Sequence, residues 1–129
     1  MTDLSFELEP RLNAGQQARQ VLRERIGEQL VDGKIDDLMT IMTELVNNAV
    51  IHGSGRTIDV RITLDGDSSV GGRVEDQGDG PQVIRELPEP VRDGGLGLRI
   101  VDALADRWGF YPGTNTVWFE IGEAAGLRE

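Results

Sequence analysis

The chain has 129 residues, the length of one domain spanning 1–129, and its 13 Lys and Arg against 23 Asp and Glu give a formal net charge of −10 at pH 7. This acidity argues against direct nucleic-acid binding, which needs a basic face, and the lack of cysteine excludes disulfides, thiolate metal sites and a Cys nucleophile. Because the start lacks a signal-peptide pattern and no stretch approaches the ~20 apolar residues of a membrane span, we expect a cytoplasmic protein without membrane contact.

The first half of the chain predicts one strand and two helices. Apolar residues at alternate positions in 4–9 predict a short strand that ends before a proline. A single apolar stripe along 14–30 predicts the first helix. The Asp-Gly pair at 32–33 indicates a break. The second helix is predicted from about residue 35 to residue 51, with carboxylates in its first turn.

A β-hairpin is predicted next. Strict alternation of apolar and polar residues in 58–64 predicts a half-buried strand, the Asp-Gly-Asp sequence at 65–67 predicts its turn, and 70–76 is the return strand. The period of two places Asp76 on the face that should meet the helices. A carboxylate on a covered face needs a partner, because burying it unpaired is costly.

The last third of the chain begins with a loop. Segment 78–95 has little periodicity and contains three prolines, and loops this long in compact domains are usually functional or disordered. A third helix follows around 98–105, and two strands are predicted at about 107–111 and 116–121. The whole order predicts the α+β class, as a two-layer α/β sandwich with the helices on one face of a mixed sheet.

The second helix carries the most informative residues. Glu44 and Asn48 are four positions apart, so they share a helix face at one edge of the apolar stripe, whereas Asn47 points away. An amide oxygen suits Mg²⁺, and a neighbouring carboxylate could take a proton from an attacking hydroxyl or water. The structural alternative is that both residues border the stripe and bond to the backbone. The predicted stripe consists of Leu38, Met42, Leu45, Val46, Ala49 and Val50.

Two glycine-rich segments follow. Asp76 leads into Gly78 and Gly80, where the chain could approach a ligand closely, and its carboxylate could accept a hydrogen bond from the exocyclic amine of adenine. The alternative is an ordinary turn after a strand. Segment 94–98 opens the third helix, where free backbone N–H groups could hold phosphate. The alternative there is a plain loop end, and Arg85 and Arg92 could either close over phosphate or be solvated.

In combination these segments resemble a known superfamily. Glu44-x-x-x-Asn48-Ala49-x-x-His52-Gly53, followed by 74–80 and 95–98, resembles the asparagine box and the two glycine boxes of the GHKL (histidine-kinase-like) ATPases. Segments 103–110 and 116–120 look like its small stand-alone branch, the anti-sigma factor serine/threonine kinases. A sensor histidine kinase would need an acceptor His on a separate helical pair, and the single His of this chain is His52.

The resemblance implies a Bergerat-type fold that binds ATP and Mg²⁺. It makes Asn48 the metal ligand, Glu44 the general base and Asp76 the acceptor of the adenine amine, under a lid at about 81–93. Thr116 would support the adenine through water. The other residues implied in nucleotide binding are Gly78, Gly80, Arg92, Gly95, Leu96, Gly97 and Leu98.

The same resemblance implies a biological role. Members of this branch transfer the γ-phosphoryl group to a Ser or Thr of an anti-anti-sigma partner of the STAS type and sequester a sigma factor, and they can form homodimers. A second hypothesis is a nucleotide-binding protein-interaction module without kinase activity. A third is a plain α+β domain in which the motifs coincide by chance.

Overall fold

One five-stranded sheet and the helices packed on it make up the described part of the chain. The computed structural model describes residues 2–30, 32–52, 56–65, 69–76, 96–111, 114 and 116–122. In chain order the elements are β1 (Thr2–Leu8), α1 (Ala14–Ile26), the 3₁₀ helix η1 (Gly27–Gln29), α2 (Asp32–His52), β2 (Ile58–Leu64), β3 (Val70–Asp76), α4 (Leu96–Leu104), β4 (Arg107–Phe110) and β5 (Thr116–Ile121).

The predicted α+β sandwich is confirmed, but the described sheet is antiparallel and not mixed. The strand order is β1-β2-β3-β5-β4, and all four neighbouring pairs are antiparallel. With two successive helices between β1 and β2 the chain reverses direction three times, so these strands pair antiparallel. β3 and β4 do run in the same direction, as a helical crossover requires. However, β5 lies between them, so they share no hydrogen-bond ladder.

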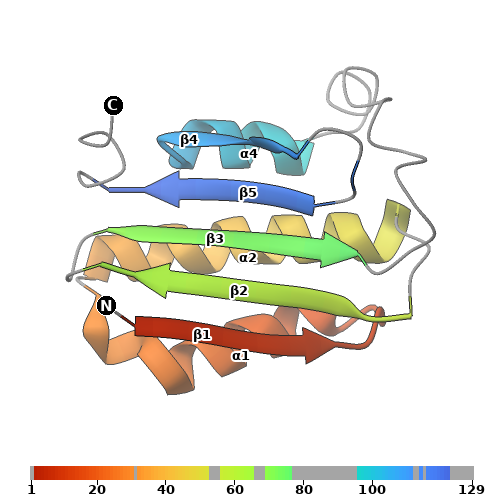
Figure 1. Ribbon diagram of the computed structural model, residues 1–129, viewed down its shortest axis with the longest axis horizontal. Helices are drawn as coiled ribbons and strands as arrows, with labels where there is room; N and C mark the ends of the chain where they lie inside the picture. The colour runs from red at the N-terminus through yellow and green to blue at the C-terminus, as the bar shows by residue number, and fades with distance from the viewer. Residues whose placement is uncertain are drawn as a thin grey trace.

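The helices cover a single face of the sheet (Figure 1). Alternate residues of the strands point to that face, and their side chains form the core together with α1, α2 and α4. The core side chains with at most 2% exposure include Leu22, Ile26, Leu38, Ile41, Met42, Leu45, Ile58, Ile62, Phe119 and Ile121. The opposite face carries the polar residues of the same strands, such as Asp59, Arg61 and Arg73.

Both long helices differ from their predicted bounds. α2 begins at Asp32, so the break predicted at 32–33 is wrong. Gly33 lies in the first turn, where its N–H needs no intrahelical acceptor, and an added Cβ would meet nothing within 4 Å. The predicted helix over 14–30 ends as an α-helix at Ile26 and continues as the 3₁₀ helix η1. Such tightening is common at helix C-termini.

Gly72 allows the middle of β3 to pack closely against β5. It is paired with Phe119 in register, and a Cβ at Gly72 would lie 2.7 Å from both Phe119 Cε1 and Ile62 Cδ1. The ring of Phe119, itself 1% exposed, therefore occupies the space that a side chain at Gly72 would need. Gly71 faces the other way, and there the nearest atom to an added Cβ is at 3.8 Å.

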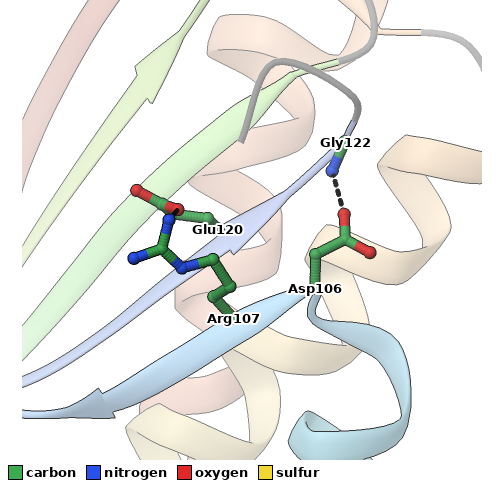
Figure 2. Close-up of polar contacts among 4 residues, drawn as sticks. All are labelled: Asp106, Arg107, Glu120 and Gly122. Atoms are coloured by element: carbon green, nitrogen blue, oxygen red, sulfur yellow. Dashed lines mark hydrogen bonds and ion pairs between the residues drawn. The ribbon is translucent and has the colours of Figure 1, made fainter. Parts of the chain in front are cut away.

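Hydrogen bonds and an ion pair connect β4 and β5 near the C-terminal end of β5. The backbone N–H of Gly122 donates to Asp106 Oδ2 at 2.6 Å (Figure 2). The N–H of Asp106 donates to the carbonyl of Glu120 at 2.9 Å. Arg107 Nη1 lies 3.6 Å from Glu120 Oε1. Gly122 has φ 110°, a conformation that glycine adopts without a steric penalty.

We expect Gly72→Ala to destabilise the domain and Gly71→Ala to leave it unchanged or slightly more stable. The two positions are neighbours on one strand, so strand propensity changes equally, and only the Gly72 methyl meets Phe119 and Ile62. Overpacking of this kind costs about 1–3 kcal/mol. Urea unfolding monitored by tryptophan fluorescence measures both free energies of unfolding. Equal values for the two variants would show that Phe119 moves aside at no cost.

Candidate nucleotide-binding site

The predicted motif residues come from elements that end or begin at the same end of the molecule. Figure 1 shows the C-terminal ends of α2 and β3 at the same end of the sheet, on the right of the view. The register pairs Glu75 with Thr116, so β5 begins there too. α4 must also begin there, because it returns the chain from β3 to β4, which runs in the same direction as β3. The topology therefore gathers Asn48, Asp76 and the first turn of α4 in one region.

The orientation of α2 is defined by its neighbours. α2 packs against α1 on one side and against α4 on the other. A Cβ added at Gly15 of α1 would lie 2.8 Å from Asn47 Oδ1 and 3.5 Å from Thr43 Cγ2, so these two residues face α1. Each residue of an α-helix is rotated about 100° from the one before it. Glu44 and Asn48 are therefore turned away from α1, toward the side where α4 packs.

Glu44 and Asn48 are half-buried side chains with unengaged polar atoms. For the described residues, the structure records no hydrogen bond or ion pair that occupies either side chain. The hydroxyls of Thr40 and Thr43 on the same helix do bond backward, to the carbonyls of Asp36 and Met39 at 3.0 and 2.8 Å. The alternative in which Glu44 and Asn48 serve the backbone is thus unsupported, and their oxygen atoms are available to a ligand.

Asp76 lies on the helix-covered face at the end of β3, as predicted. It is 7% exposed, it pairs in register with the fully buried Ile58, and it follows Val74 on the same face. As expected for a buried carboxylate, it is not without an interaction partner. Its position at the end of the strand places a charged group at the boundary between the apolar core and the site.

α4 begins within the second glycine motif. Leu96 and Gly97 form its first turn, and Leu98 is 3% exposed and belongs to the hydrophobic core. Leu98 could therefore contribute to nucleotide binding through its backbone only. The first N–H groups of a helix have no intrahelical acceptor, so the N-terminus of α4 suits phosphate binding.

The structure does not bring Thr116 to Asp76. Thr116 is buried (6% exposed) and pairs with Glu75, and side chains directly opposite each other across two strands lie on the same face. Asp76 follows Glu75, so it points to the other face. The backbone N–H of Thr116 donates to the Thr114 hydroxyl at 3.1 Å. Its predicted role behind the adenine has no support in this arrangement.

Several predicted site residues lie outside the described residues: Gly78, Gly80, Arg85, Arg92, Gly95 and the segment 81–93. Within the described part, no group of three or more His, Asp or Glu side chains could hold a metal ion. Mg²⁺ is usually held by one or two protein groups together with substrate phosphates and water. The amide oxygen of Asn48 fits an ion of that kind.

The contact of Gly15 with Asn47 was not predicted. An isolated glycine inside a helical pattern lowers the stability of the helix and can therefore indicate a packing requirement. That indication was available in the sequence at Gly15, but the sequence does not show which element packs there.

Among the helices of the described ranges, none is long and apolar enough to cross a membrane.

The family model for the histidine kinase-like ATPase domain matches residues 7–121. The chain belongs to the histidine kinase-like ATPase family. Membership implies that this ATPase domain binds ATP, and it confirms the family resemblance inferred from the three motifs. No curated protein sequence matches the chain.

A solved structure is also similar to this ATPase domain. It contains the RsbU and RsbW domains of Rv1364c from Mycobacterium tuberculosis, with 26% sequence identity and a TM-score of 0.66. The match covers 94% of this chain and 31% of that chain, so the ATPase domain spans about a third of the protein to which it is similar. The similarity to an RsbW domain agrees with the anti-sigma factor kinase branch indicated by the sequence.

Proposed function

We propose that this chain is a cytoplasmic anti-sigma-type protein serine/threonine kinase that uses Mg-ATP. The observation that carries the proposal is the pair of unengaged polar side chains, Glu44 and Asn48, on the face of α2 turned toward α4. They lie at the same end of the sheet as the buried Asp76 and the first turn of α4, in a domain of an ATPase family. A domain that only held a partner protein would not need this carboxylate and amide to be free.

Each residue has a separate task in the proposed reaction. Asp76 accepts a hydrogen bond from the adenine amine, and the N-terminal N–H groups of α4 receive phosphate oxygens. Asn48 holds Mg²⁺, which supplies charge neutralisation at the phosphates when bound. Glu44 accepts the proton of the acceptor hydroxyl. The hydroxyl oxygen then forms a bond to the γ-phosphorus as the bond from that phosphorus to the β–γ bridging oxygen breaks, and ADP leaves.

The proposed partners follow from the branch and not from an interface in this structure. The acceptor would be a Ser or Thr of an anti-anti-sigma protein with a STAS domain, and the second partner a sigma factor. The similarity to a structure with an RsbW domain supports this choice. A homodimer of the chain is compatible with the proposal.

We expect Asp76→Asn to weaken ATP binding about 10- to 150-fold, because a hydrogen bond to a charged group contributes about 1.5–3 kcal/mol. Glu75→Gln is the matched control, since Glu75 neighbours Asp76 but faces the other side of the sheet. Calorimetric titration with ATP, with and without Mg²⁺, measures the affinities, and thermal unfolding confirms that both variants fold. Equal affinity in the two variants would remove Asp76 from the adenine site. No binding by the folded unsubstituted protein would favour a module that acts by protein contact alone.

Glu44→Gln should retain Mg-ATP affinity and lose phosphoryl transfer, because the amide keeps the shape of the side chain and cannot take a proton. Asn48→Ala should instead lose the Mg²⁺ dependence of binding. Transfer is measured with [γ-³²P]ATP and a STAS-domain protein from the same genome, and ATP hydrolysis serves as a second readout. Transfer by Glu44→Gln at the unsubstituted rate would contradict the proposed base.

A further inference from the structure

Two contacts from α1 reach α2 beside the proposed site. At the first, Gly15 is buried, and the space that its Cβ would take lies 2.8 Å from Asn47 Oδ1. A side chain at Gly15 would therefore force the Asn47 amide to move. At the second, one turn along α1, Arg19 Nη1 donates to the Thr43 hydroxyl at 2.8 Å, and that hydroxyl donates to the carbonyl of Met39 at 2.8 Å.

These contacts involve the residues directly before Glu44 and Asn48. Thr43 precedes Glu44, and Asn47 precedes Asn48. The two contacted residues are therefore four positions apart, the same spacing as between the two site residues. Because consecutive helical residues differ by about 100° in direction, fixing Thr43 and Asn47 against α1 also fixes the direction of Glu44 and Asn48. The two pairs behave as one rigid unit, since α2 is a continuous helix from Asp32 to His52.

We propose that α1 positions the catalytic face of α2, with Gly15 and Thr43 as positioning residues that set the rotation of the helix. The inference rests on the proposed function, and it adds residues outside the three motifs. A reacting site must be held to within about 0.5 Å and 10–20° of its productive geometry. A misplacement of about 1 Å can cost about 100-fold in rate. A small shift of α2 at Gly15 is therefore sufficient to impair transfer.

The first test compares Gly15→Ala with Gly33→Ala. Both replace a helical glycine, and alanine favours the helix at either place. Only the methyl at position 15 meets another helix, because an added Cβ at Gly33 meets nothing within 4 Å. We expect Gly15→Ala to lower kcat about tenfold or more, whereas the affinity for ATP without Mg²⁺ should stay within about twofold, since Asp76 on β3 is not displaced. Gly33→Ala should leave both parameters unchanged.

The second test compares Thr43→Val with Thr40→Val. Both hydroxyls bond to the carbonyl four residues earlier on α2, but only Thr43 also accepts from α1. A lower kcat in Thr43→Val alone would show that the interhelical bond matters, and Thr43→Ser should restore it. In a double-mutant cycle, Asn47→Ala should partly rescue Gly15→Ala, because it removes the atom that the new methyl meets.

A readout that does not depend on activity separates this inference from the proposed function. The side-chain NH₂ resonances of Asn48 in ¹⁵N-labelled protein should shift in Gly15→Ala and not in Gly33→Ala, with equal thermal unfolding temperatures. Unchanged Asn48 resonances and unchanged kcat in Gly15→Ala would overturn the positioning role. If the unsubstituted protein binds no ATP, the proposed function fails, and the resonance comparison still decides whether α1 sets the orientation of Asn48.

Discussion

Helix α2 packs against the sheet, α1 and α4 at once, and the arrangement of the proposed site depends on this constraint. Its core side chains pack on the sheet, with Leu38, Ile41 and Met42 fully buried. Thr43 and Asn47 meet α1, and α4 packs on the opposite side. Only a narrow polar strip is left, on which Glu44 and Asn48 lie. The strip is polar because it borders the core without joining it, so charged and amide groups there remain accessible to a ligand.

The proposed site therefore borders the hydrophobic core, because its residues lie on the elements that form that core. Asp76 continues the inward-facing row of β3, after Val70, Gly72 and Val74. The packing of Phe119 over Gly72 fixes β3 against β5. A change at Gly72 would thus act on Asp76 through the same strand. The proposed role of Asp76 therefore couples nucleotide binding to stability, because one row of side chains would serve both.

Local patterns predicted the strands well, and long-range relations less well. The bounds of β2, β3 and β5 agree with the predictions: strict alternation defines β2, and the turn predicted at 65–67 separates it from β3. The sheet order could not be predicted, since the insertion of β5 between β3 and β4 depends on contacts distant in sequence. The start of α2 was missed because Gly33 is tolerated in a first turn. The role of Thr116 was implied by the family resemblance alone, and the register that pairs Thr116 with Glu75, on the face opposite Asp76, is a long-range relation that the sequence does not show.

The proposed chemistry and the helix face shared by Glu44 and Asn48 were predictable from residue types and spacing, whereas the contacts with α1 that set the rotation of α2 were not. Segment 43–48 divides its residues among three surroundings: Thr43 and Asn47 face α1, Leu45 and Val46 enter the core, and Glu44 and Asn48 form the polar strip. A motif written as Glu-x-x-x-Asn specifies only the last of these. The unspecified positions determine how the helix is rotated, and rotation determines whether a carboxylate can reach an acceptor hydroxyl. Two domains with the same motif can therefore differ in rate through residues that never touch the nucleotide.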